Sequence, residues 1–222
     1  MQPLIPNMAQ LSRYEVNNPN QYEAVRQPLY DFQTYASAGQ VQLNFFQVQI
    51  GSAGKTIDDT NMELAGTLPR PKHFLVEIME IHFYPGVNPV TQAAGTVLLS
   101  APNYTNDVLD ALKLGSVDFF IGSKSYLKQA SLMRFPPSAR LAAEFGVTAQ
   151  MGQAAAANLT LQITAEYAAA AGRPFMIMPR ILLITQQNFK VSLNWSAAVP
   201  LPSAVNARIG VVLDGIEYRW SQ

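Results

Sequence analysis

The segment Gly54–Thr56 has the residue types of a phosphate-binding loop, because it joins a glycine, a lysine and a hydroxyl after the strand-like run "FQVQI". A P-loop also needs a glycine five positions before its Gly-Lys pair, and this chain has Gln49 there. Asp58 and Asp59 follow and would repel a phosphate. We therefore predict an exposed polar connection between strands that binds no nucleotide, in which Lys55 contributes almost nothing to stability.

The two histidines stand at the ends of one apolar stretch, "HFLVEIMEIH". In an extended strand, alternation places His73 and Glu77 on one face, and Glu80 and His82 on the other. A protein metal site normally takes three or four ligands, and neither face offers more than two. We expect no metal here, and assign the histidines to a strand rim or a subunit contact.

Catalytic constellations are equally sparse. The chain has no cysteine and no Gly-x-Ser-x-Gly motif, and two histidines leave little from which to build a Ser-His-Asp triad. Asp107 with Asp110, or Asp58 with Asp59, could formally serve a glycosidase. The first pair fits the first turn of a predicted helix, where carboxylates interact with the helix dipole, and the second fits a solvated loop. We predict no enzyme, no catalytic residue and no cofactor.

The charges give no nucleic-acid surface. Fifteen basic residues balance fifteen acidic ones, so no global field attracts a polyanion. One loose basic cluster is interleaved with two aromatic residues, Tyr126 and Phe135, and consists of Lys124, Lys128, Arg134 and Arg140. Four cations would give modest, salt-dependent affinity. We expect no specific nucleic-acid binding.

The composition favours a subunit of an assembly. Hydrophobic residues make up 49% of the 222 residues and charged residues only 14%, against about 25% in typical soluble domains. A chain with so few charged residues cannot cover its exterior with them, so we expect much of its surface to be buried against other chains. The start of the sequence shows no basic segment followed by an apolar one, and no long apolar run follows, so we expect neither a signal peptide nor a transmembrane helix.

From Gln40 onward, apolar and β-branched runs alternate with clusters of Gly, Pro, Asn and Ser, which predicts an all-β domain. A helix is predicted over Thr105–Gly115, and a second short helix around Ala139–Phe145. Strands are predicted over Val41–Ile50, His73–Tyr84, Thr96–Ser100, Val117–Ile121, Leu159–Tyr167, Phe175–Thr185, Phe189–Trp195 and Arg208–Trp220. In the last of these, Val211 and Leu213 should lie in the core, Gly215 should allow a turn or bulge, and Trp220 should pack against protein.

Residues 1–40 differ from the remainder, since they are dense in Asn, Gln, Tyr and Pro without a sustained period. Two interpretations fit this composition, an extended arm and a disordered tail. The aromatic residues favour an arm that docks on neighbouring subunits. The candidate subunit contacts are Tyr14, Tyr22, Tyr30, Phe32 and Tyr35.

The phrases "FLVEIMEIHFYPG", "KVSLNW" and "ARIGVVLDGIEYRW", with an arm before them, resemble a jelly-roll viral capsid protein of the bacteriophage type. The likeness covers most of residues 41–222 as a pattern. It implies an antiparallel eight-stranded jelly-roll β-sandwich with an inserted short helix and an extended N-terminal arm. It also implies a virion protein, assembled in the host cytoplasm with copies of itself and other capsid proteins, as trimers or pseudo-hexamers. Some such phages hold an internal membrane, which would be a further contact.

The alternative is a β-sandwich module that binds a carbohydrate or a receptor, or decorates a shell. The low charge favours the shell subunit, because a free binding module needs a soluble exterior. We expect residues 41–222 to form one jelly roll, since two would need about twice the strands that the pattern offers.

Overall fold

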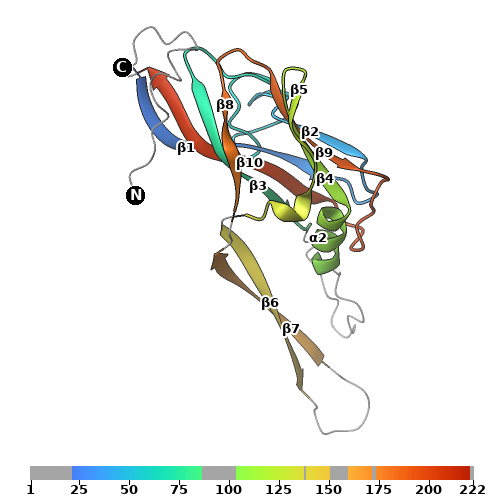
Figure 1. Ribbon diagram of the computed structural model, residues 1–222. Coiled ribbons are helices and arrows are strands. Elements are labelled where there is room, and N and C mark those ends of the chain that lie inside the picture. Colours follow the sequence, from blue (N-terminus) through green and yellow to red (C-terminus); the bar gives the residue numbers. More distant parts are fainter. Residues whose placement is uncertain (1–21, 87–103, 138, 151–159, 172–173, 221–222) are drawn as a thin grey trace.

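A computed structural model describes residues 22–86, 104–137, 139–150, 160–171 and 174–220, and shows two four-stranded antiparallel sheets (Figure 1). The first sheet contains, in spatial order, β1 (Tyr22–Tyr35), β10 (Ala207–Trp220), β3 (His73–Tyr84) and β8 (Phe175–Leu183). The second contains β2 (Gln42–Phe45), β9 (Phe189–Trp195), β4 (Gly115–Ile121) and β5 (Lys124–Ser131).

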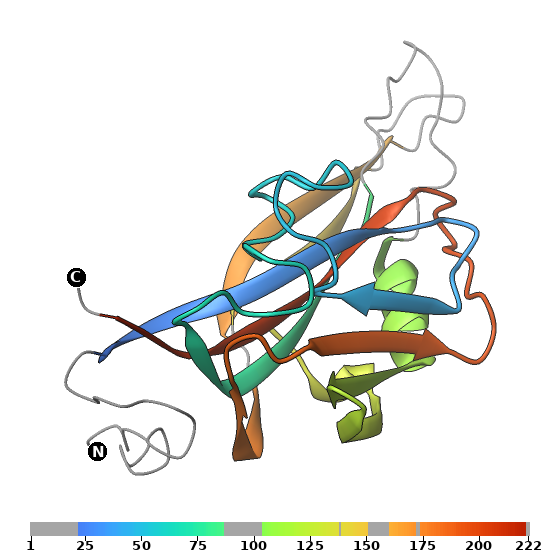
Figure 2. The same cartoon turned by 90° about the horizontal axis from the view of Figure 1, so that it is seen from above.

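The path of the chain between these sheets is that of a jelly roll. Apart from the hairpin β4–β5, each connection between successive strands of the sandwich crosses from one sheet to the other. The two sheets are stacked as layers, with β1 and β10 in one and β2 and β9 in the other (Figure 2). The predicted antiparallel, eight-stranded jelly-roll β-sandwich with a short inserted helix is therefore confirmed.

The core fills the space between the sheets with alternate residues of both. Its largest fully buried aromatic side chains include Phe45, Phe74, Phe119 and Phe189, contributed by β2, β3, β4 and β9. Burying one such side chain stabilises the fold by about 1.5–3 kcal/mol. The core is thus the physical reason why the apolar alternation of the sequence gives this sandwich.

Helix α2 (Tyr104–Lys113) lies at one end of the sandwich, close to the predicted bounds. The Trp195 indole N–H donates to the Ala111 carbonyl at 2.8 Å and ties β9 to the helix. Asp107 is buried, and its carboxylate accepts from the Ser203 backbone N–H at 2.9 Å, so it has a structural role. No helix among the described residues is long and apolar enough to cross a membrane.

The closing strand β10 confirms two predictions and corrects a third. Val211 and Leu213 are fully buried, and the register with β3 shifts at Asp214/Gly215 as a bulge. Gly215 is required by space, because a Cβ there would lie 1.9 Å from the Leu75 carbonyl oxygen. The prediction for Trp220 is wrong: 56% of it is exposed, since alternation places it on the side of the first sheet that turns away from the second.

Part of the expected arm belongs to the sandwich. Residues 22–35 form the fourteen-residue strand β1, paired with β10 from Tyr22↔Trp220 to Tyr35↔Ala207. The inward positions of β1 include Asp31 and Gln33, and these polar residues interrupt the apolar alternation by which a core strand is recognised. Residues 1–21, which include Tyr14, lie outside the described residues.

A two-stranded ribbon interrupts the sandwich between β5 and β8. It consists of β6 (Ala139–Gln150) and β7 (Thr160–Ala171), and extends away from the two sheets (Figure 1). The predicted helix over Ala139–Phe145 is therefore wrong, because apolar residues recur there at every second position. The predicted strand Thr96–Ser100 lies outside the described residues, and β5 was not predicted because its sequence, "KSYLKQAS", is largely polar.

Candidate functional site

The lysine of the Gly54–Thr56 segment is part of the fold. Lys55 Nζ forms an ion pair with Asp31 Oδ1 and donates to the Phe32 carbonyl at 3.2 Å. Asp31 is fully buried on the inward side of β1, and its second oxygen accepts from the Phe46 backbone N–H at 2.5 Å. Burial raises the pKa of the Asp31 carboxyl above its ordinary value, although the hydrogen bonds from Lys55 and Phe46 offset part of this effect.

The expectation that Lys55 is exposed is therefore wrong, and its ion pair with a buried carboxylate argues against a negligible contribution to stability. Its side chain is only 13% exposed, because the loop that carries it folds along the free edge of β1. The Phe32 backbone N–H donates to the Asp59 carbonyl at 2.7 Å, and Asp31 pairs with Thr60 in an isolated antiparallel β-bridge. The loop thus covers an edge that would otherwise be open to another strand.

The histidines lie on one face of the first sheet, contrary to prediction. Glu77 is an extra residue, since Val76 pairs with Gly215 and Ile78 pairs with Asp214. This bulge reverses the alternation along β3 and brings His73, Glu80 and His82 onto the side that points away from the second sheet, which we call the outer face. Within the described residues no group of three metal-ligating side chains exists.

His73 is a buried structural residue at one end of β3. Its Nδ1 accepts from the Thr185 backbone N–H at 3.3 Å, and its ring lies 5.9 Å from that of Tyr22. Burial lowers the pKa of His73, which therefore favours the neutral form.

His82 organises a second group at the other end of β3. Its Nε2 lies 3.0 Å from Glu80 Oε2, and its Nδ1 lies 3.1 Å from the Tyr84 hydroxyl. The Phe32 ring stacks on Tyr84, with centroids 6.0 Å apart, and the Arg208 guanidinium lies 4.6 Å from the Phe32 ring. We call these five residues the His82 cluster.

Two features of the sequence build this cluster. The bulge at Glu77 places Glu80, His82 and Tyr84 at successive outer positions. Gly210 of β10 leaves room for Phe32 of β1, because a Cβ at Gly210 would lie 2.1 Å from the Phe32 ring. Arg208 is held beside the ring by an ion pair with Asp59 at 3.2 Å. Sequence reasoning missed Arg208, Gly210 and Asp31, whose partners are distant in the chain.

Ion pairs link the four strands of the first sheet across its outer face. The bulge residue Glu77 lies 3.0 Å from Arg180 and 3.8 Å from Arg26. Arg26 also pairs with Asp214 at 2.5 Å, which raises the pKa of Arg26 through that hydrogen bond. The outer face therefore combines ordered charges with aromatic rings.

The five predicted contact residues have different positions. Tyr22, Tyr30 and Phe32 occupy outer positions of β1 and are half-buried. Tyr35 is fully buried in the chain's own core, where its hydroxyl donates to the Val199 carbonyl at 2.8 Å, so it is not available to a neighbour. Whether the three outer residues contact other subunits remains a prediction.

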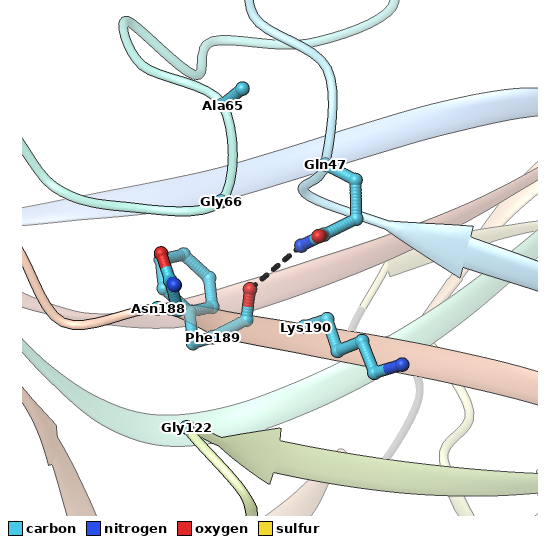
Figure 3. Close-up of a pocket in the computed structure, with 7 residues that line it drawn as sticks. All are labelled: Gln47, Ala65, Gly66, Gly122, Asn188, Phe189 and Lys190. Carbon is cyan, nitrogen blue, oxygen red and sulfur yellow. Dashed lines mark hydrogen bonds between the residues drawn. The ribbon is translucent and has the colours of Figure 1, made fainter.

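A pocket of about 240 Å³ opens at the loop end of the second sheet (Figure 3). Gln47 Nε2 donates to the Phe189 carbonyl at 2.8 Å across it. Lys190 directs its ammonium over the Phe120 ring, 5.2 Å from the centroid. The lining residues include no acid, histidine or hydroxyl side chain, and are Gln47, Ala65, Gly66, Gly122, Asn188, Phe189 and Lys190.

The outer face of the first sheet is thus the best candidate functional surface. Glu80, His82 and Tyr84 are linked as in a proton relay, but none of them lines the pocket at Gln47 or the smaller pocket beside Leu29 and Lys72. Fixed aromatic and charged groups on an open sheet suit protein docking. The chain matches no protein-family model, no curated protein and no solved structure.

Proposed function

We propose that this chain is a structural virion protein, a jelly-roll capsid subunit that self-assembles into an icosahedral shell. The observation that carries the proposal is the strand order of the two sheets, β1-β10-β3-β8 and β2-β9-β4-β5, in which a single chain wraps a complete sandwich. A fold alone does not define a function, so the surface and composition must support the same conclusion.

The exposed apolar residues give that support. Met178 is 79% exposed and Met176 is 57% exposed on β8, the edge strand of the first sheet. Other large apolar side chains that are more than half exposed are Ile57, Val41, Leu114, Trp220 and Met133. A free protein with only 14% charged residues would carry these at a solubility penalty, whereas a shell covers them with neighbours.

The partners in this proposal are copies of the chain and other capsid proteins, grouped as trimers or pseudo-hexamers in the virion. Zero net charge favours contacts with protein over nucleic acid. Contact with an internal viral membrane is part of the same proposal only for a membrane-containing virion.

The test is the native mass and appearance of the purified full chain. Light scattering and electron microscopy should find closed particles, or trimers and hexamers that close into particles when concentrated. A chain that stays monomeric at every concentration and salt condition would contradict the proposal.

One observation favours the alternative of a carbohydrate- or receptor-binding module. Tyr84 is 45% exposed and stacks on Phe32 beside Arg208, and such an aromatic surface with polar neighbours also suits a sugar ring. A monomer that binds glycans, with loss of binding in Tyr84→Ala, would favour this function over the shell.

A further inference from the structure

The ribbon β6–β7 has one wholly apolar face. In its register Leu141 lies opposite Ala169, Phe145 opposite Ala165, and residues directly opposite in an antiparallel pair share a face. Every odd-numbered position of both strands therefore falls on the same face. These twelve residues are Ala139, Leu141, Ala143, Phe145, Val147, Ala149, Leu161, Ile163, Ala165, Tyr167, Ala169 and Ala171.

The opposite face of the ribbon is suited to water. It includes Arg140, Thr148 and Gln162, and it places Glu144 directly opposite Glu166. Two like charges at opposed positions destabilise a strand pair unless solvent screens them. The polar face therefore belongs outside, and the apolar face must be covered.

Nothing within the described part of the chain pairs with this ribbon. β6 and β7 form a sheet of two strands, so each has one edge with unpaired backbone groups. A two-stranded ribbon is at best marginally stable alone in water. With twelve residues per strand, the ribbon is a long element for which the described residues supply no third strand.

We propose that the apolar face is covered by the ribbons of neighbouring copies of this chain, gathered about a symmetry axis with their apolar faces inward. Identical ribbons are complementary under rotation, because each offers the same apolar face and the same two free edges. This inference does not depend on the shell, since it requires only a closed oligomer.

The area of the face sets the number of copies. Twelve residues at about 3.3 Å each and two strands about 4.8 Å apart give a face of about 400 Å². Two stacked ribbons would bury about 800 Å², below the roughly 1,200 Å² at which stable interfaces begin. A third ribbon about the axis raises the total buried area to about 1,200 Å², so a trimer is the smallest oligomer expected from the ribbon alone.

Cysteine crosslinking tests the arrangement, because the chain has no cysteine of its own. Ala143→Cys places a thiol on the apolar face, and Ala142→Cys places the same thiol one position away on the polar face. In the full chain under mild oxidation, Ala143→Cys should form disulfide-linked dimers and Ala142→Cys should not. Equal crosslinking of both variants, or of neither, would overturn the proposal.

Association is measured by sedimentation on a second matched pair. Phe145→Lys should weaken self-association at least tenfold, whereas Thr148→Lys, on the polar face, should leave it unchanged. Near-ultraviolet circular dichroism from the buried Trp195 checks that the sandwich remains folded in both. Equal effects of the two lysines would overturn the proposal.

The result separates this inference from the proposed shell. Trimers by sedimentation, with Ala143→Cys disulfide-linked dimers but no particles, would support the ribbon contact and count against the shell. Particles whose Ala143→Cys subunits stay unlinked would support the shell and count against the ribbon contact. A monomeric wild type that floats with phosphatidylcholine vesicles, and fails to do so as Phe145→Lys, would assign the face to lipid and overturn the proposal.

Discussion

At the scale of single residues, the ion pair between Lys55 and Asp31 shows that a polar segment with the composition of an exposed loop can contribute to the core of the fold. Asp31 is fully buried, and its oxygens meet only the Lys55 ammonium and the Phe46 N–H in the hydrogen bonds described above. The sequence could not reveal this pair, because the two residues are 24 positions apart and meet only after the loop folds along β1. A Gly-Lys-Thr triplet therefore needs its spatial context before a function is assigned.

Replacing Lys55 should destabilise the chain strongly. Lys55→Ala leaves Asp31 buried without its partner, and removal of one member of a buried pair costs about 3–5 kcal/mol. Lys128→Ala, at an exposed site, is the matched control and should change stability by less than about 0.5 kcal/mol. Urea unfolding monitored by Trp195 fluorescence measures both, and equal midpoints would disprove the role of the pair.

His73 should make stability depend on pH. Burial lowers its pKa in the folded state, so the unfolded chain binds the proton more tightly. The stability that neutral His73 contributes is fully present above the unfolded-state pKa of about 6.5, and it is lost as the pH falls toward the lowered folded-state pKa. His73→Gln should therefore flatten the slope of unfolding free energy against pH below about pH 6.5. An unchanged slope in that variant would assign the pH dependence elsewhere.

At the scale of elements, apolar runs were sufficient to predict most strands of the sandwich, while local irregularities escaped prediction. β1 was missed because Asp31 and Gln33 take inward positions, and these are satisfied by Lys55 and by the Asn44 carbonyl. The faces of β3 were misassigned because one bulge residue, Glu77, reverses them. The ribbon was taken in part for a helix, because alanine favours helices and the strand alternation in this segment is carried largely by alanine.

The bulge between β3 and β10 should tolerate no side chain at position 215. Gly215→Ala would bring a Cβ within 1.9 Å of the Leu75 carbonyl oxygen, and the central strands must then separate. Overpacking of this kind costs about 1–3 kcal/mol, and more when backbone must move. Gly122→Ala is the comparison, because its Cβ would meet nothing within 4 Å and only the positive φ of 57° opposes it. Thermal unfolding should rank Gly215→Ala as the less stable variant, and the reverse order would contradict this account of the bulge.

At the scale of the whole molecule, the two edges of the first sheet are treated differently. A loop covers the β1 edge, whereas β8 presents Pro179 and exposed methionines at the other. Proline on an edge strand prevents continuous pairing with another strand, so contacts there must use side chains. Methionine adapts its shape to varied partners, so the exposed methionines of β8 fit the contacts of the proposed shell subunit.

The His82 cluster should matter for assembly and not for folding. Tyr84 is 45% exposed at the outer face, so Tyr84→Glu adds a charge beside Glu80 without disturbing the core. Such a charge in a closed subunit contact is left unpaired and costs several kcal/mol, enough to abolish assembly. The expected result is a folded protein that loses only the Tyr84 contacts with His82 and Phe32, unfolds cooperatively, and remains in small species by light scattering.

The matched variant is Tyr126→Glu on β5 of the second sheet, where Tyr126 is 48% exposed. If the outer face of the first sheet is the contact surface, this variant assembles as wild type while Tyr84→Glu does not. If both assemble, Tyr84 is not in a contact. If only Tyr126→Glu fails, the second sheet carries the contact, because the same added charge is then tolerated on the first sheet and not on the second.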